Sequence, residues 1–235
     1  MYGISAYGDN YQVKMAISAP SNMKLCLIFD CDGTLVDSEE LCNLGLQTEL
    51  LSYGIEEDTV TLTMRFRGWK LADICRNLEM QHGLTFNPDF ISRYRQTVDK
   101  LFESHLEAFP GVVDTLSKLR LPVCVASAAP RGKIKRALSL TGLSEFFEDR
   151  IYSSYDIQSW KPEPDLFLYA ARQMDFLPHQ CIVIEDSEVG IEAAKRAGMS
   201  ALWFCPDAQA NATLDVQVFT DMRELPSFLQ QREQK

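Results

Sequence analysis

The hydrophobic pattern of this chain alternates between short apolar runs and longer segments with apolar residues at helical spacing. Continuous apolar runs of this kind fit strands that are buried on both faces of a sheet. The predicted strands are 25–29, 122–127, 151–153, 181–184, 201–204 and 216–219, and the helices after them are 112–120, 131–140, 165–174, 188–197 and 221–231. Strands that alternate with helices predict an α/β fold with a parallel, doubly wound sheet.

Residues 39–106 interrupt this alternation, because only helical spacing occurs there. The predicted helices of this region are 39–50, 58–65, 70–80 and 88–105. No alternating pattern of the kind that predicts a strand is found between them. The simplest organisation is an α/β core formed by residues 23–38 and 107–235, with a small all-helical domain, residues 39–106, inserted after the first strand.

Composition and charge narrow the class of protein. The 235 residues suffice for one sizeable core and a smaller module, and the net charge of -10 argues against a nucleic-acid partner, which needs a basic face. No apolar run has the length of a membrane span, and residues 1–22 lack the features of a signal peptide. We expect residues 1–22 to be a loosely ordered N-terminal extension. The seven scattered cysteines lack metal-ligand spacing and predict a cytoplasmic protein. We expect the protein to be a monomer or a weak homodimer.

The first predicted strand ends in two acids, Asp30 and Asp32, which are followed by Gly33. Open α/β sheets bind ligands at the carboxyl ends of their strands, and a glycine there lets the chain turn sharply away. Two close carboxylates raise each other's pKa unless a cation lies between them. Mg²⁺ suits such a pair, because it binds through one or two carboxylates and a substrate phosphate. For these acids alone, a solvated acidic loop is an equally good interpretation.

Other chemically active residues follow the remaining predicted strands. Ser127 and the pair Glu185-Asp186 end two of them, and Lys161 lies in the loop after a third. Each residue also has an ordinary structural interpretation, as a turn residue, a solvated charge or a group that complements a helix dipole. Together with Asp30 and Asp32, these residues supply the nucleophile, positive charge, hydroxyl and proton donor that phosphoryl transfer needs.

The order of these motifs resembles that of the haloacid dehalogenase (HAD) superfamily. The string Asp30–Ser38 resembles its first signature, and Ser127 resembles the second. Lys161–Pro164 and Ile184–Ser187 resemble the third and fourth signatures. The resemblance covers nearly all of residues 23–220 and implies a Rossmann-like core with an inserted cap that closes over the cleft.

The resemblance implies separate roles for the two acids. Asp30 would be the nucleophile that forms an aspartyl-phosphate, and Asp32 would be the general acid and then the general base. The acid role needs a pKa for Asp32 above the ordinary aspartate value. Asp32 also argues against dehalogenation, because halide leaves without a proton and the dehalogenases of this superfamily lack this acid.

The resemblance also implies a set of binding residues. The catalytic groups Ser127 and Lys161 would contact the phosphate, with Mg²⁺ as the cofactor. The implied substrate-binding residues are Gly33, Arg67, Lys70, Ser127, Ala128 and Lys161. The implied metal ligands are Asp30, the backbone carbonyl of Asp32 and Asp186, with Glu185 as a nearby or water-mediated partner. Relatives carry Ser-Asn in the second signature, so Arg131 is a candidate to replace the charge near the missing amide of Ala128.

The cap resembles that of the β-phosphoglucomutases and their phosphatase relatives. A mutase is the alternative activity, but Cys42 and Leu71 stand where mutases carry a histidine and an arginine. The strings 66–71, 155–162 and 203–205 resemble the bacterial 6-phosphogluconate phosphatase group. We therefore expect a Mg²⁺-dependent phosphatase for a small sugar or sugar-acid phosphate, with 6-phosphogluconate as a candidate. A non-catalytic binding protein would be expected to lack an acid or the lysine, and none is missing.

Overall fold

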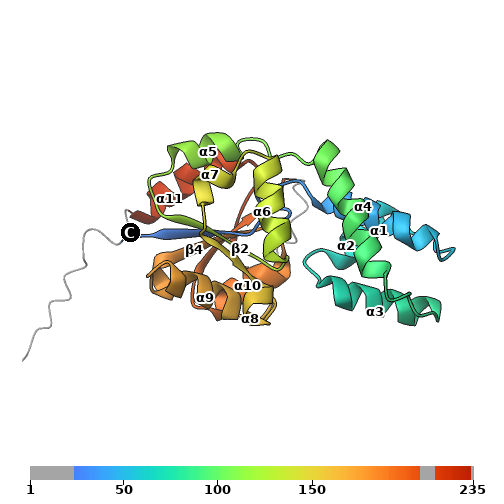
Figure 1. Ribbon diagram of the computed structural model, residues 1–235. Coiled ribbons are helices and arrows are strands. Elements are labelled where there is room, and N and C mark those ends of the chain that lie inside the picture. Colours follow the sequence, from blue (N-terminus) through green and yellow to red (C-terminus); the bar gives the residue numbers. More distant parts are fainter. Residues whose placement is uncertain (1–23, 207–214, 234–235) are drawn as a thin grey trace, which may run out of the picture.

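The computed structural model describes residues 24–206 and 215–233. Six strands in this part of the chain form one parallel sheet, which lies between helices in Figure 1. The strand order is β3-β2-β1-β4-β5-β6. The strands are β1 (Cys26–Phe29), β2 (Val123–Ser127), β3 (Ile151–Ser153), β4 (Cys181–Glu185), β5 (Ser200–Phe204) and β6 (Gln217–Phe219). The chain builds outward from β1 to β3, then crosses to β4 on the other side. The predicted doubly wound sheet is confirmed, and its strand order reverses beside β1, where such sheets bind ligands.

The register of β1 sets the level at which the site residues emerge. Phe29 is paired with Val125 of β2 and with Ile184 of β4. The next backbone N–H, that of Asp30, donates to the carbonyl of Ile184 at 2.9 Å. Asp30 and Glu185 therefore leave neighbouring strands at the same height.

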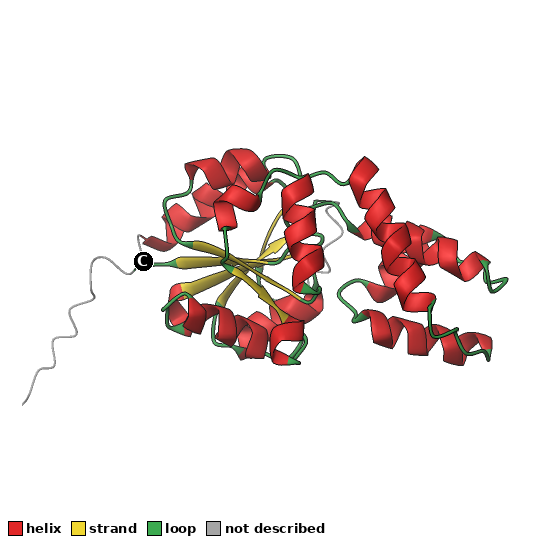
Figure 2. Ribbon diagram, in the orientation of Figure 1, coloured by secondary structure: helices red, strands yellow, loops and turns green. Residues whose placement is uncertain are grey.

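Helices cover both faces of the sheet, as Figure 2 shows. On one face lie α5 (Val112–Lys118), α6 (Arg131–Leu140), α7 (Ser144–Phe147) and α11 (Leu225–Glu233); on the other lie α8 (Ser154–Ile157), α9 (Asp165–Gln173) and α10 (Glu188–Arg196). Two 3₁₀ turns, η1 (Pro178–Gln180) and η2 (Met222–Glu224), precede β4 and α11. The sequence missed α7 and α8, because a single turn is too short to show a helical period.

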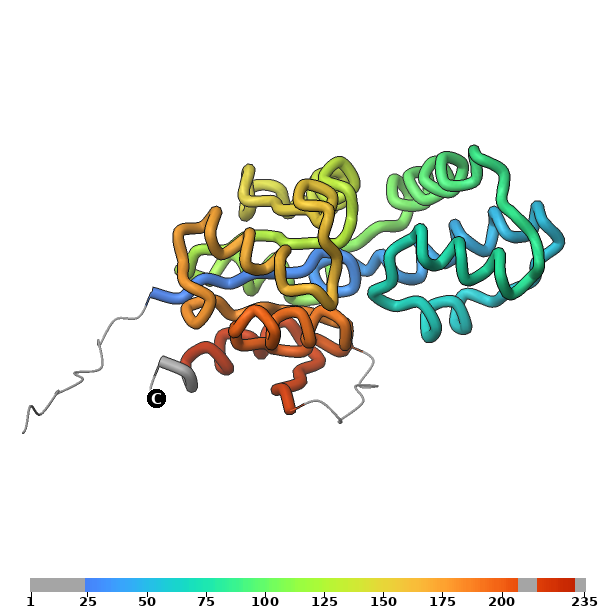
Figure 3. The backbone as a smooth tube through the Cα atoms, turned by 90° about the horizontal axis from the view of Figure 1, so that it is seen from below, coloured from blue at the N-terminus to red at the C-terminus, as the bar shows by residue number. Residues whose placement is uncertain are grey.

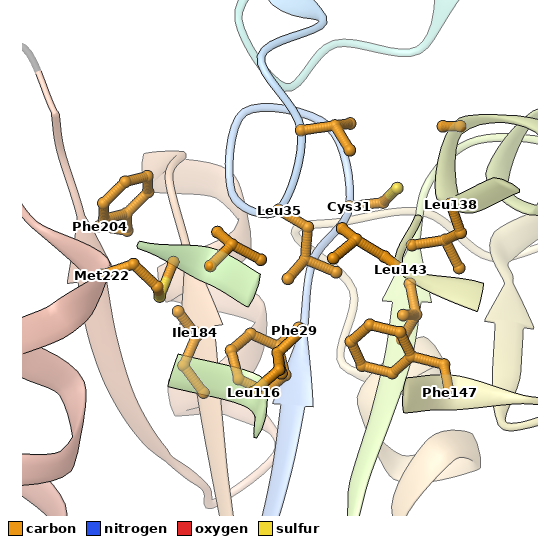
Figure 4. Close-up of a cluster of buried hydrophobic side chains, with 14 of the residues drawn as sticks. Phe29, Cys31, Leu35, Leu116, Leu138, Leu143, Phe147, Ile184, Phe204 and Met222 are labelled. Atoms are coloured by element: carbon orange, nitrogen blue, oxygen red, sulfur yellow. The ribbon is translucent and has the colours of Figure 1, made fainter. Parts of the chain in front are cut away.

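Two apolar clusters hold the sheet between these helix layers. In the cluster drawn in Figure 4, Phe29 and Ile184 of the sheet face Leu116 of α5 and Phe147 of α7. The rings of Phe29 and Phe147 meet edge to face, with centroids 6.1 Å apart. Burial of each side chain of this size contributes about 1.5–3 kcal/mol to the stability of the fold. Because β1 is buried on both faces, its carboxyl end is firmly placed.

The segment between β1 and α5 forms four helices that lie beside the carboxyl edge of the sheet (Figures 1 and 3). They are α1 (Glu39–Leu51), α2 (Thr59–Phe66), α3 (Leu71–His82) and α4 (Phe90–His105), and we call them the insert. They share their own buried cluster, which includes Leu50, Leu62, Leu78 and Phe90. A bridge between Val36 and Ala108 joins the two connections to the sheet. The insert therefore leaves and rejoins the core at one place.

The domain division at residues 38 and 107 stays a prediction, although the insert has its own apolar cluster. The expectation of a loosely ordered extension at residues 1–22 falls outside the described residues. Among the described helices, none combines the length and the apolar character that crossing a membrane requires.

Candidate active site

A cleft of about 450 Å³ lies between the carboxyl edge of the sheet and the insert. The predicted residues that line it are Asp30, Asp32, Lys70, Ser127, Ala128, Lys161, Glu185 and Asp186. Two further predicted residues, Gly33 and Arg67, contact Asp186. The structure therefore brings the acids, the serine and the lysine to one cleft, as the strand ends predicted.

Asp30 lies at the bottom of the cleft and is held by Lys161. The Lys161 ammonium donates to Oδ1 of Asp30 at 2.7 Å and also donates to Oε1 of Glu185. Burial raises the pKa of Asp30 to about 7, although the positive charge of Lys161 acts in the opposite direction. Burial alone would lower the pKa of Lys161, but Asp30 and Glu185 raise it above the ordinary lysine value. Lys161 is therefore a compact positive charge beside the candidate nucleophile.

Glu185 is fixed at the end of β4 by the first residues of the following turn. Its Oε2 accepts hydrogen bonds from the backbone N–H and the hydroxyl of Ser187, both at 2.8 Å. A Cβ atom at Gly190 would lie 2.0 Å from the Glu185 side chain, so the glycine makes room for this carboxylate. With Oε1 bonded to Lys161, both oxygens have partners. Glu185 thus orients Lys161, and its predicted contact with a metal stays a prediction.

Three carboxylates form a candidate cation site. One oxygen from each of Asp30, Glu185 and Asp186 lies within 4.8 Å of the others. Oδ2 of Asp186 is buried without a hydrogen-bond donor in the described chain, and the nearby Arg67 Nε is 3.6 Å away. Burial, with the charges of Glu185 and other acids, raises the pKa of Asp186 well above its usual range. A buried carboxylate oxygen without a donor is costly, and hard divalent cations bind oxygen ligands. The residues present therefore fit the predicted Mg²⁺.

Gly33 is part of the backbone that makes room for Asp186. It adopts a φ of +79°, a left-handed conformation that favours glycine. A Cβ atom at this position would lie 2.3 Å from Oδ2 of Asp186. Gly33 therefore acts on the candidate cation site through Asp186, and its predicted contact with the substrate stays a prediction.

Asp32 occupies an outer part of the cleft and has different partners. Its Oδ1 accepts hydrogen bonds from Ser38 Oγ at 2.5 Å and Lys133 Nζ at 2.9 Å. Burial favours a higher pKa for Asp32, but Lys133 and Ser38 outweigh it and lower the pKa below the ordinary value. The expectation of a raised pKa is therefore wrong for this arrangement. The reason is Lys133, a residue that lies outside the four signatures.

Lys133 could have been found from its position in the chain. Helix α6 starts at Arg131, shortly after β2 ends at Ser127. A residue in the first turn of such a helix lies at the carboxyl edge of the sheet, where the other site residues gather. The position of Lys133 in the first turn of α6 therefore indicates a further positive charge at this edge.

The second signature departs from one expectation. Ser127 Oγ accepts a hydrogen bond from the backbone N–H of Ala129 at 3.2 Å, which leaves its hydroxyl proton to donate toward the cleft. The Arg131 guanidinium donates to Asp156 at 2.8 Å and does not line the cleft. The expectation that Arg131 replaces the missing amide is therefore wrong, because this arginine is paired with Asp156 of α8.

The loop between α2 and α3 touches the sheet body. The Lys70 ammonium lies 3.3 Å from the ring centroid of Trp160, and Arg67 forms its ion pair with Asp186. A cation over an aromatic face is attracted by the ring quadrupole. Both predicted substrate contacts of this loop are directed at protein groups in this structure, so the insert is docked on the core.

The fold and the site together define a class of protein: a parallel α/β enzyme that gathers a buried carboxylate, an ammonium group and a candidate cation site at one sheet edge. The chain belongs to the haloacid dehalogenase-like hydrolase family, whose model matches residues 27–204. The predicted resemblance to this superfamily is thereby confirmed.

Relatives of known activity extend the likeness over most of the chain. The 6-phosphogluconate phosphatase of Escherichia coli K12 is 36% identical over 209 residues, which are 88% of this chain and 95% of the relative. The fructose-1-phosphate phosphatase of the same organism is 30% identical over 182 residues, which are 75% of this chain and 94% of the relative. A haloacid dehalogenase-like protein from Agrobacterium tumefaciens has a similar structure, with a TM-score of 0.77 and 28% identity, covering 89% of this chain and 99% of that one.

Proposed function

We propose that this protein is a Mg²⁺-dependent phosphatase that hydrolyses small sugar or sugar-acid phosphate monoesters through an aspartyl-phosphate on Asp30. The observation that carries the proposal is the buried Asp30, bonded to Lys161 and next to Asp186 at the bottom of the cleft. The two E. coli relatives, a 6-phosphogluconate phosphatase and a fructose-1-phosphate phosphatase, support the same class of reaction.

In the first half of the reaction, a carboxylate oxygen of Asp30 attacks phosphorus and the bond to the ester oxygen breaks. Lys161 offsets the negative charge of Asp30, which lets the anionic phosphate approach. The Ser127 hydroxyl and the backbone N–H groups after Asp30 donate to the phosphoryl oxygens. Mg²⁺ held by Asp30, the carbonyl of Asp32 and Asp186 would supply further positive charge to the phosphate.

Asp32 moves the proton in both halves. It gives a proton to the leaving alcohol, and it then takes one from the water that attacks the aspartyl-phosphate. In the geometry described above, its low pKa gives the carboxylate form that the second half needs. A phosphate dianion that enters beside Asp32 opposes this negative charge and favours uptake of the proton for the first half.

The walls of the cleft suit a small polyhydroxylated ester. The insert contributes both apolar and polar side chains to the cleft lining, so a sugar can be held by packing and by hydrogen bonds. The lining residues on that side include Asn43, Leu46, Trp69, Tyr94, Arg95 and Val98. The 36% identity to a 6-phosphogluconate phosphatase makes that sugar acid the first candidate substrate.

Location and assembly stay predictions. Each of the seven cysteines is a free thiol, which supports the expected reducing cytoplasm. The expected monomer or weak homodimer can be checked by light scattering at several protein concentrations.

The test is phosphate release with Mg²⁺ from a panel that includes 6-phosphogluconate, fructose 1-phosphate, glucose 6-phosphate, glucose 1-phosphate and p-nitrophenyl phosphate. We expect release from the sugar esters, and a loss of about 10⁴-fold or more in Asp30→Asn. The matched control is Asp149→Asn, an exposed acid far from the cleft lining, which should keep the wild-type rate.

Two outcomes would contradict the proposal. One is a folded Asp30→Asn variant, with an unchanged circular dichroism spectrum, that hydrolyses its substrates at the wild-type rate. The other is interconversion of glucose 1-phosphate and glucose 6-phosphate with little free phosphate, which is the behaviour of a mutase.

A further inference from the structure

Lys133 reaches from the core helix α6 to the outer acid of the cleft. Its ammonium donates to Oδ1 of Asp32 at 2.9 Å and to Sγ of Cys42 at 3.6 Å. It also lies 5.5 Å from the ring centroid of Phe102, on α4. The position of the ammonium is therefore set by α1 and α4 of the insert as well as by Asp32.

The two oxygens of Asp32 have different surroundings. Ser38 and Lys133 both donate to Oδ1, and Oδ2 accepts no hydrogen bond from the described residues. An ionised carboxylate accepts through both oxygens, so two donors on one oxygen fix its orientation and leave the other available. Because Asp32 lines the cleft, Oδ2 is the oxygen left to meet a ligand there.

We propose that Lys133 is a positioning residue, which anchors Oδ1 of Asp32 so that Oδ2 exchanges the proton with the leaving oxygen. The inference rests on the proposed role of Asp32 as general acid and base. Lys133 itself transfers no proton and touches no reacting atom. In the second half, the same Oδ2 takes the proton of the attacking water.

A comparison within α6 separates this pair from an ordinary surface ion pair. Lys135 reaches Asp149 at 3.3 Å, and the two side chains are 51% and 96% exposed. The side chains of Lys133 and Asp32 are 28% and 19% exposed. Exposed pairs contribute about 0–1 kcal/mol to stability and hold their partners loosely. Lys133 is instead enclosed by the insert. A side chain that fixes the orientation of the Asp32 carboxylate must itself be held in place by packing.

The test compares esters whose leaving groups differ in their need for a proton. The p-nitrophenolate ion leaves without a proton, whereas the sugar oxygen of glucose 6-phosphate must be protonated as it leaves. In Lys133→Met, kcat/KM for glucose 6-phosphate should fall by about 10- to 100-fold, because a misplaced proton donor costs this much. For p-nitrophenyl phosphate it should fall by less than about threefold.

Two matched variants sharpen the test. Lys133→Arg keeps a donor for Oδ1 and should recover part of the rate on glucose 6-phosphate. Lys135→Met removes a lysine from the same helix and should leave the ratio of the two rates unchanged. If Lys133→Met does not fold, Ser38→Ala removes the other donor to Oδ1 and should lower the same ratio.

Three results would overturn the assignment. Equal falls on both esters would mean that Lys133 has a structural or phosphate-binding role, and no fall would mean that it has no role in the reaction. A fall on 6-phosphogluconate without one on glucose 6-phosphate would mean that Lys133 binds the substrate carboxylate. Failure of the proposed function is a separate result, in which the wild-type protein releases phosphate from none of these esters.

Discussion

The deep and outer parts of the cleft each pair one acid of the first signature with one lysine. In the deep part, Asp30 meets Lys161 at 2.7 Å, and the side chains are 8% and 4% exposed. In the outer part, Asp32 meets Lys133 at 2.9 Å, with both side chains partly exposed. The pKa of Asp30 is raised and that of Asp32 is lowered, although the two acids are separated by one residue. Their surroundings, and not their spacing, make them different.

The surroundings differ in origin as well as in burial. The partners of Asp30 come from the loops and strand ends of the sheet body, whereas Lys133 also contacts the insert. The deep pair should therefore affect folding and chemistry together. The outer pair should affect chemistry in a way that depends on the leaving group, with a smaller effect on stability than the deep pair.

Removal of the deep lysine should have the largest effect. Lys161→Met leaves Asp30 and Glu185 buried without their positive partner, which should lower the free energy of unfolding by about 3–5 kcal/mol. It should also lower kcat by about 10²–10³-fold or more, because positive charge at the phosphate is lost. Urea unfolding and phosphate release measure the two effects. Lys133→Met removes a partly exposed pair and should lower the free energy of unfolding by less, about 1–3 kcal/mol. Equal losses of stability in the two variants would contradict the distinction between the two pairs.

An added methyl group at Gly33 should weaken the cation site by an intermediate amount. In Gly33→Ala, the new Cβ would collide with Asp186, and Mg²⁺ affinity measured by calorimetry should fall by about 10- to 100-fold. Gly142→Ala is the matched control, since Gly142 also has a positive φ but no atom within 4 Å of the added Cβ. Unchanged Mg²⁺ affinity in a folded Gly33→Ala protein would show that Asp186 does not hold the cation.

The loop of the insert should give the smallest effect. Lys70→Ala removes the cation over Trp160, a contact of about 0.5–1 kcal/mol, so KM should rise a few-fold with kcat nearly unchanged. Steady-state kinetics measure the change, and Lys70→Arg should restore the wild-type value. A fall in kcat as large as that of Lys161→Met would instead make Lys70 part of the catalytic machinery.

The deep part of the cleft could be predicted from the sequence because parallel strands bring their carboxyl ends together. Asp30, Ser127 and Glu185 directly end or follow buried strands, so their convergence depends only on the strand order. The sheet itself was predicted for the same reason, since its strands are continuous apolar runs.

The outer part could be predicted only in part, because the first turn of α6 places Lys133 at the edge of the sheet but does not determine its partner. The contact of Lys133 with Asp32 depends on how α6 is rotated and on how the insert is docked, and neither leaves a pattern in the sequence. The general-acid role implies a raised pKa for Asp32, whereas the contact with Lys133 lowers that pKa. Likewise, nothing in the spacing of Arg131 indicates its pairing with Asp156 of the short helix α8.

The central claim is that Asp30 forms a covalent phosphoryl intermediate, and trapping that intermediate tests it directly. The protein is mixed with Mg²⁺ and 6-phosphogluconate, quenched in acid within milliseconds and reduced with borohydride, which converts an acyl phosphate to an alcohol. Mass spectrometry of the peptide that contains Asp30 should then find homoserine at position 30 and nowhere else. Phosphate release with no reduced residue at position 30, or with the label on another acid, would contradict the account.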